Sequence, residues 1–122
     1  MICMNAVRLL IDPPLPGTVN MARDEALLDA CRLPDTPPIL RFYAWQTATV
    51  SLGYFQEFGE FERLEPPAGN LPVVRRTTGG GAILHDLEVT YSIVMPLAHP
   101  LIVGRPHALY RLAHAAILSA ID

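Results

Sequence analysis

The sequence contains no lysine, because all nine of its basic residues are arginine. A reaction step that needs an ammonium side chain therefore finds no group in this chain to supply it. The nine arginines are scattered among twelve acidic residues, and the net charge is −3. This distribution lacks the basic patch that nucleic-acid binding requires, so we expect no nucleic-acid partner.

Cysteine and long apolar runs are also scarce. The two cysteines, Cys3 and Cys31, do not have the spacing of a metal site. We expect no secretory signal in the first residues, which favours reduced thiols and a cytoplasmic location. No stretch approaches the roughly 20 apolar residues of a membrane span, so we expect no membrane partner.

What is present suffices for one domain: the chain has 122 residues, of which 51% are hydrophobic. Apolar runs between turn residues predict an α+β fold, a mixed β-sheet flanked by helices. We expect residues 39–43 and 47–53 to pair as a hairpin, and residues 57–65 to form a short helical turn. The expected strands lie near residues 7–11, 39–43, 47–53, 73–75, 82–84 and 88–95, and the expected helices near 20–31 and 105–121.

The first expected helix has two candidate N-terminal caps, Thr18 and Asn20. Asp24 and Glu25 would then lie in its first turns, near the positive end of the helix dipole. Its apolar positions recur at helical spacing: Ala22, Ala26, Leu27 and Ala30.

The last expected helix carries an apolar stripe with a period of about 3.6 residues. Its other face carries four polar side chains: His107, Tyr110, Arg111 and His114. A metal site is one interpretation of this face, but no acidic or cysteine ligand accompanies the two histidines. A solvated face is the favoured interpretation, and we predict no metal site.

The most informative segment is residues 75–86, which reads RRTTGGGAILHD. Three consecutive glycines allow positive φ angles and close approach of the backbone to a ligand, and their N–H groups can bind an anion. Arg75 and Arg76 add forked donors suited to phosphate or carboxylate. Alone, a glycine triplet is often a tight turn and an arginine pair a solvated face, but the combination is typical of a phosphate or acyl-phosphate site.

This segment resembles the signature of the biotin/lipoate A/B protein ligase family, in its branch of lipoate ligases and octanoyltransferases. Three other segments, residues 20–28, 40–45 and 51–56, are similar to that branch and occur in the same order. The resemblance implies that residues 1–122 form the N-terminal part of a class II biotin/lipoate ligase-like catalytic domain, truncated at its C-terminal end.

The resemblance also implies a chemistry, protein lipoylation. Lipoate ligases activate lipoate with ATP and magnesium, then pass the acyl group to a lysine of a lipoyl carrier domain. Octanoyltransferases take octanoate from an acyl carrier protein through a cysteine thioester. The acyl substrate is therefore expected to be lipoate or octanoate.

The family pattern assigns roles to residues of this chain. Ser51 and Gly53 are expected to border the acyl chain. Trp45 either stacks on a ligand or packs in the core. The residues expected to bind the nucleotide or acyl-adenylate are Arg75, Arg76, Thr78, Gly79, Gly80, Gly81, Ala82, Ile83, Leu84 and His85.

Two departures bear on activity. Both branches use a lysine downstream of the glycine signature, and the octanoyltransferase nucleophile is a cysteine further downstream; neither position has a match here. We therefore predict no catalytic residue in this chain and no acyl transfer by the chain alone. It is either a fragment, one subunit of a split ligase that needs a separate C-terminal chain, or a non-catalytic remnant that binds an acyl group or a partner.

Overall fold

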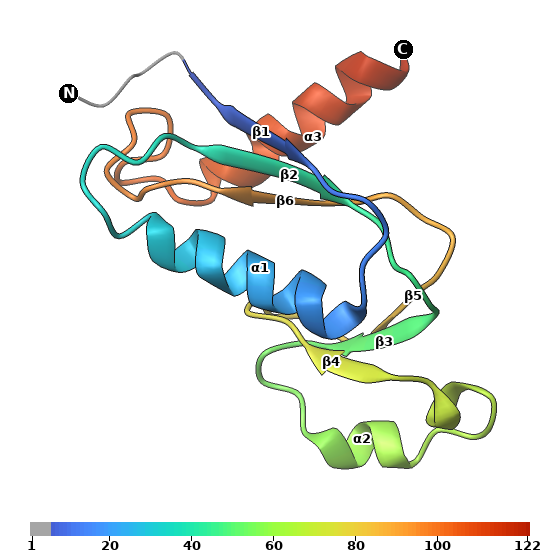
Figure 1. Cartoon of the computed structure of the whole chain (residues 1–122). Coiled ribbons are helices and arrows are strands. Elements are labelled where there is room, and N and C mark those ends of the chain that lie inside the picture. Colours follow the sequence, from blue (N-terminus) through green and yellow to red (C-terminus); the bar gives the residue numbers. More distant parts are fainter. Residues whose placement is uncertain (1–5) are drawn as a thin grey trace.

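The computed structural model describes residues 6–122, so Cys3 lies outside the described residues. The chain forms two three-stranded sheets with helices packed on them (Figure 1). The α+β class is confirmed, but the expectation of one sheet is wrong. The elements in chain order are β1 (Arg8–Ile11), α1 (Gly17–Ala30), β2 (Ile39–Tyr43), β3 (Thr49–Leu52), α2 (Phe58–Glu62), the 3₁₀ turn η1 (Ala68–Asn70), β4 (Val73–Arg75), β5 (Ile83–His85), β6 (Thr90–Val94) and α3 (Ala108–Ile121).

Both sheets are mixed. In the first, β2 pairs in parallel with β1 and antiparallel with β6, and in the second β3 pairs in parallel with β4 and antiparallel with β5. The predicted hairpin between residues 39–43 and 47–53 is therefore wrong. Both edges of β2 are already hydrogen-bonded, to β1 and β6, so β3 must find its partners elsewhere. The short connection after Trp45 carries the chain from one sheet to the other.

Helix α1 contacts β6 of the first sheet and β4 of the second. It begins at Gly17 with Pro16 before it, so the predicted caps are wrong: Thr18 and Asn20 lie inside the helix, and the first turn holds no acidic residue. Of the apolar positions that recur at helical spacing, Ala22 and Ala26 are exposed, and Leu27 and Ala30 are half-buried. The helix instead turns Gly17, Asn20 and Asp24 inward, where the sheet offers polar partners rather than an apolar surface.

The second sheet has its own small core. Val50 and Leu52 of β3 pack against Phe61 of α2, with Leu71 and Val73 partly buried beside them. The expected helical turn over 57–65 is thus present as α2, and its amphipathic character explains its position: Phe61 points inward while the glutamates around it stay exposed. This core supports the strand ends from which the glycine-rich segment leaves.

Helix α3 lies over the outer face of the first sheet, opposite α1 (Figure 1). Its predicted apolar stripe faces Leu40, Phe42 and Ile93 across an apolar cavity of about 240 Å³, and none of its residues is buried. The four polar residues of the other face are exposed, as expected: His107, Tyr110, Arg111 and His114. Among residues 6–122 no helix is long and apolar enough to cross a membrane.

Candidate functional site

A cavity of about 790 Å³ lies beside the glycine-rich segment. One side is largely apolar and aromatic, with Met21 from α1, Tyr43 and Trp45 from the end of β2, and Tyr110 from α3. The other side is the glycine loop, which we define as residues 76–82 between β4 and β5. The cavity therefore joins a surface suited to an alkyl chain with a surface made of backbone.

The glycine loop presents unpaired backbone donors. None of the N–H groups of residues 77–82 donates a hydrogen bond to any described residue. Gly80 has φ +94°, a conformation that side-chain-bearing residues rarely adopt and that lets successive peptide groups turn. A run of free N–H groups at the end of a cavity is a binding surface for an anion such as phosphate or carboxylate.

The two arginines of the motif donate to the chain's own oxygens. Arg75 is exposed, and its Nη1 reaches the carbonyls of Gly53 at 2.9 Å and Gln56 at 2.5 Å. Arg76 lines the cavity, and its guanidinium joins Ser51 of β3 to the glycine loop. Burial lowers the pKa of Arg76 below the usual value, but not enough to discharge a guanidinium at neutral pH.

Beneath the loop lies a series of polar side chains, of which Ser51 and His85 are buried and Glu88 is exposed. Ser51 is fully buried and its Oγ lies 2.7 Å from Nε2 of His85, whose Nδ1 bonds the carboxylate of Glu88. The imidazole stacks on Trp45 with ring centroids 4.0 Å apart. Trp45 in turn donates its indole N–H to Thr90, so its orientation is fixed. The aromatic wall and the glycine loop are thus held together by His85.

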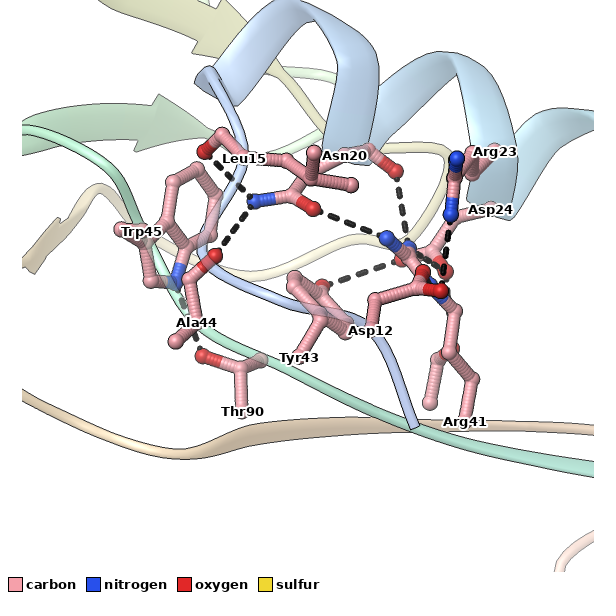
Figure 2. A network of polar contacts seen from close by, with 11 residues as sticks. Asp12, Leu15, Asn20, Arg23, Asp24, Arg41, Tyr43, Ala44, Trp45 and Thr90 are labelled. Carbon is pink, nitrogen blue, oxygen red and sulfur yellow. Dashed lines mark hydrogen bonds and ion pairs between the residues drawn. The ribbon is translucent and has the colours of Figure 1, made fainter. Parts of the chain in front are cut away.

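A second polar network, centred on buried Arg41, borders the cavity through Asp24 and Tyr43 (Figure 2). The Arg41 side chain has no exposed surface, and it bonds the carboxylates of Asp12 and Asp24 at 2.7 and 2.8 Å. It also donates to the backbone and side-chain oxygens of Asn20 and lies over the ring of Tyr43. A buried guanidinium is tolerable only when its donors are satisfied in this way.

Asp24 connects this network to the cavity. Its carboxylate accepts hydrogen bonds from Tyr43 at 3.0 Å and Ser92 at 2.7 Å as well as from Arg41, and it lines the cavity. Burial, together with the negative charge of Asp24, raises the pKa of the Tyr43 hydroxyl far above its usual range. Tyr43 therefore stays protonated and remains a donor to Asp24 at any physiological pH.

Asp12 predicts an acid sensitivity of the fold. Burial alone would raise its pKa, but hydrogen bonds from Arg41 and Arg23 outweigh burial and hold the pKa below 3.8. A depressed carboxylate pKa stabilises the folded state above the unfolded pKa, and this stabilisation is lost as the pH falls through the folded pKa. Replacing Asp12 with asparagine is expected to flatten the dependence of unfolding free energy on pH below about pH 5. Urea titrations from pH 7 to 3 measure this slope, and equal slopes in both proteins would contradict the assignment.

Comparison with known proteins places this geometry in a family. Residues 16–121 match the family model of the lipoyl protein ligase A/B catalytic domain. The chain belongs to this family. Among curated relatives, an octanoyltransferase LipM from Moorella thermoacetica is 54% identical over 99 residues, covering 79% of this chain and 36% of the relative. The chain therefore spans about a third of that relative's length.

Solved structures of the family agree with the fold. A bipartite lipoate protein ligase from Thermoplasma acidophilum, studied with its E2 lipoyl domain, aligns with a TM-score of 0.56 and 32% identity over 70% of this chain and 34% of the other. A lipoate-protein ligase A bound with ATP aligns with a TM-score of 0.52 and 34% identity, over 70% and 35% of the two chains. The recognition of the lipoate ligase and octanoyltransferase branch from residues 75–86 is thus confirmed.

The structure brings most of the family's expected site residues together. Those that line the cavity are Trp45, Arg76, Thr78, Gly79, Gly80, Gly81, Ala82, Ile83 and His85. Four others lie outside the lining. Ser51 and Gly53 are buried behind the loop, Arg75 holds the turn after β3, and Leu84 is largely exposed beyond the cavity. Assignment of a ligand role to any of them stays a prediction.

The sequence interpretation missed the Arg41 network and the cavity residues Met21, Asp24 and Tyr43. The sequence did contain a pattern that indicates part of the Arg41 network. Asn20 and Asp24 are four residues apart and share one face of a helix, and Arg41 and Tyr43 are two apart and share one face of a strand. The sequence could not reveal that these two faces meet.

Proposed function

We propose that the chain contributes the acyl-binding part of an enzyme of protein lipoylation. The acyl group is octanoyl or lipoyl, and the final acceptor is a lysine of a lipoyl carrier domain. The observation that carries this proposal is the union of an aromatic, apolar wall with the free N–H groups of the glycine loop in one cavity. An alkyl chain fits the wall, and the polar end of an activated acyl group fits the loop.

The octanoyltransferase relatives favour octanoyl transfer over ATP-driven ligation. In that case an acyl carrier protein is the donor partner, and the acyl group arrives as a thioester. If the chain serves a ligase, the phosphates of ATP fit the loop's N–H donors. Magnesium would then accompany the phosphates of ATP. Within residues 6–122 no group of three or more His, Cys, Asp or Glu side chains lies together. A cytoplasmic location remains part of this proposal.

A second proposal concerns the reacting groups. The chain has no lysine, and the one described cysteine, Cys31, does not line the cavity. Burial raises the pKa of the Cys31 thiol, which disfavours the nucleophilic thiolate. We infer that the cation and the thiolate come from a C-terminal segment or a separate chain, and that residues 1–122 form a partial catalytic domain that binds the acyl group.

The 122-residue chain alone is therefore expected to leave a lipoyl carrier domain unmodified. The test incubates both proteins with octanoyl-acyl carrier protein, or with lipoate, ATP and magnesium, and follows the mass of the carrier domain. Missing preorganised donors typically cost on the order of 100- to 1000-fold in rate, and a missing nucleophile costs more. A mass shift at the rate of an intact enzyme would overturn the second proposal.

Binding of the acyl group tests the first proposal separately. Octanoyl-sulfamoyl adenosine, a stable analogue of an acyl-adenylate, is expected to bind the chain in a calorimetric titration and to shift the amide signals of the glycine loop. Adenosine, which lacks the acyl chain, is the control. Equal affinity for the two compounds would show that the aromatic wall does not hold an alkyl chain.

A further inference from the structure

The position of the Arg76 side chain is not that of a free phosphate ligand. One guanidinium nitrogen, Nη1, donates to the carbonyl of Ser51 at 2.8 Å and to its Oγ at 2.6 Å. The other, Nη2, donates to the carbonyls of Gly79 at 3.0 Å and Gly81 at 2.8 Å. A guanidinium has five N–H bonds, so these contacts engage four of them and leave only Nε–H without a described acceptor.

These contacts set the direction of the loop's donors. In a trans peptide the N–H bond points opposite to the C=O bond of the same unit. Because the carbonyls of Gly79 and Gly81 point toward the guanidinium, the N–H groups of Gly80 and Ala82 point away from it. Neither N–H has an acceptor among the described residues. Arg76 thus aligns two alternate donors of the loop in one direction, which is the arrangement of an anion-binding nest.

A series of hydrogen bonds, running from buried Ser51 through buried His85 to exposed Glu88, fixes Arg76 in turn. Ser51 Oγ accepts from Arg76, so its own hydrogen is free to be donated to Nε2 of His85. That donation requires the tautomer with a proton on Nδ1, which the carboxylate of Glu88 accepts. Glu88 does not line the cavity, so its influence on a ligand must pass through His85 and Ser51.

The arrangement of Ser51, His85 and Glu88 has the order of a serine hydrolase triad, but it cannot act as one. Ser51 has no exposed surface, and its oxygen already accepts a hydrogen bond from a cation. A nucleophilic oxygen must reach a substrate carbonyl, and this one is sealed beneath the loop. The hydrogen bonds between Ser51, His85 and Glu88 therefore orient Arg76, and Ser51 does not act as a nucleophile.

We propose that Arg76 is a positioning residue: it holds the glycine loop so that the N–H groups of Gly80 and Ala82 bind the anionic end of the ligand, and the Glu88–His85–Ser51 chain keeps it in place. This deepens the proposed function, and its ligand is the polar end of the activated acyl group that the proposed function assigns to the loop. That end is the carbonyl oxygen of a thioester, on which negative charge develops during acyl transfer, or the phosphate of an acyl-adenylate. The ligand's charge is then met by backbone donors, with the guanidinium behind them.

Three substitutions test the proposal at successive links. Arg76→Lys keeps the charge but offers an ammonium that cannot reach both pairs of oxygens. Ser51→Ala removes one hydroxyl and leaves Arg76 intact. Glu88→Gln changes a residue that does not line the cavity. The matched control is Glu62→Gln, because Glu62 is an exposed residue of α2 with no partner among the described residues.

The first measurement is the position of the Gly80 and Ala82 amide signals in nitrogen-15 correlation spectra of the ligand-free chain. All three variants are expected to move both signals, and Glu62→Gln is expected to leave them in place. This measurement needs no ligand. It therefore tests whether Arg76 holds the glycine loop even if the wild-type chain binds no acyl-adenylate analogue and the proposed function fails.

The second measurement is the affinity for octanoyl-sulfamoyl adenosine and for octanoate, by calorimetry. Arg76→Lys is expected to weaken the analogue about tenfold or more, and Glu88→Gln severalfold, because misaligned donors lose charge-assisted hydrogen bonds. A loss of affinity in Arg76→Lys with unmoved Gly80 and Ala82 signals would show direct contact and overturn the proposal. Wild-type signals and affinity in Glu88→Gln would remove Glu88 from it.

Discussion

Replacing Arg41 with methionine is expected to destabilise the chain by about 3–5 kcal/mol, which is the cost of breaking a buried ion pair by removing one partner. Methionine fills a similar volume but leaves the carboxylates of Asp12 and Asp24 without the cation that both contact. The backbone and side-chain oxygens of Asn20 lose their hydrogen bonds from Arg41 as well. Small domains are stable by about 5–15 kcal/mol, so this loss is a large fraction of the total free energy of unfolding.

Urea unfolding followed by circular dichroism measures this loss. The matched control is Arg32→Met, since the Arg32 side chain is 81% exposed and its ion pair with Asp29 spans 3.7 Å. An exposed pair of this kind contributes about 0–1 kcal/mol, so the control is expected to unfold near the wild-type midpoint. A loss below about 1 kcal/mol in Arg41→Met would mean that water replaces the guanidinium, and that the network does not order α1 on the sheet.

The local patterns of the sequence were enough to place the strands and the glycine loop. The alternation in residues 88–95 predicts that Thr90 and Ser92 share a face. In the structure Thr90 accepts a hydrogen bond from the indole of Trp45, and Ser92 donates one to Asp24 of α1. Tyr91 and Ile93 face the cavity under α3 instead. A period of two residues is a local property, so the sequence alone determines it.

The arrangement of the strands could not be predicted in the same way. Residues 39–43 and 47–53 are close in sequence and both are typical strands, which favours a hairpin. The competing pairings of β2 join residues 31 positions earlier and about 50 later in the chain, such as Arg8 with Ile39 and Leu40 with Ile93. No local pattern reports contacts of that separation. The same limit hid the partners of Arg41, which are Asp12 after β1 and Asn20 and Asp24 of α1.

In the glycine loop the motif was recognised correctly, but the sequence did not reveal that Arg76 binds carbonyls of the loop itself. Arginine beside a glycine triplet predicts phosphate binding because both groups have affinity for anions. In the folded chain the carbonyls of the same loop compete for the guanidinium and hold it. Sequence alone cannot decide between a ligand's oxygen and a backbone oxygen, since both accept the same hydrogen bond.

The last prediction concerns Gly53, at the end of β3. A Cβ built on Gly53 would lie 1.9 Å from the carbonyl oxygen of Gly80 and 3.2 Å from the carbonyl carbon of Gly79. These atoms are backbone, so no side-chain rotation relieves the overlap. The backbone of Gly53 is outside the left-handed region, and its need for glycine is therefore steric. Replacing Gly53 with alanine must displace the glycine loop or the end of β3.

Gly53→Ala is accordingly expected to reduce the affinity for octanoyl-sulfamoyl adenosine by about 100-fold or more, because the loop's N–H groups leave the positions that an anion needs. The expected loss of stability is smaller, about 1–3 kcal/mol, as for overpacking elsewhere. Gly59→Ala in α2 is the control: its added Cβ meets no atom within 4 Å. Calorimetric titration and urea unfolding of both variants separate the two effects. An affinity within threefold of the wild type in a folded Gly53→Ala chain would show that the contact between β3 and the glycine loop does not position the ligand's anionic end.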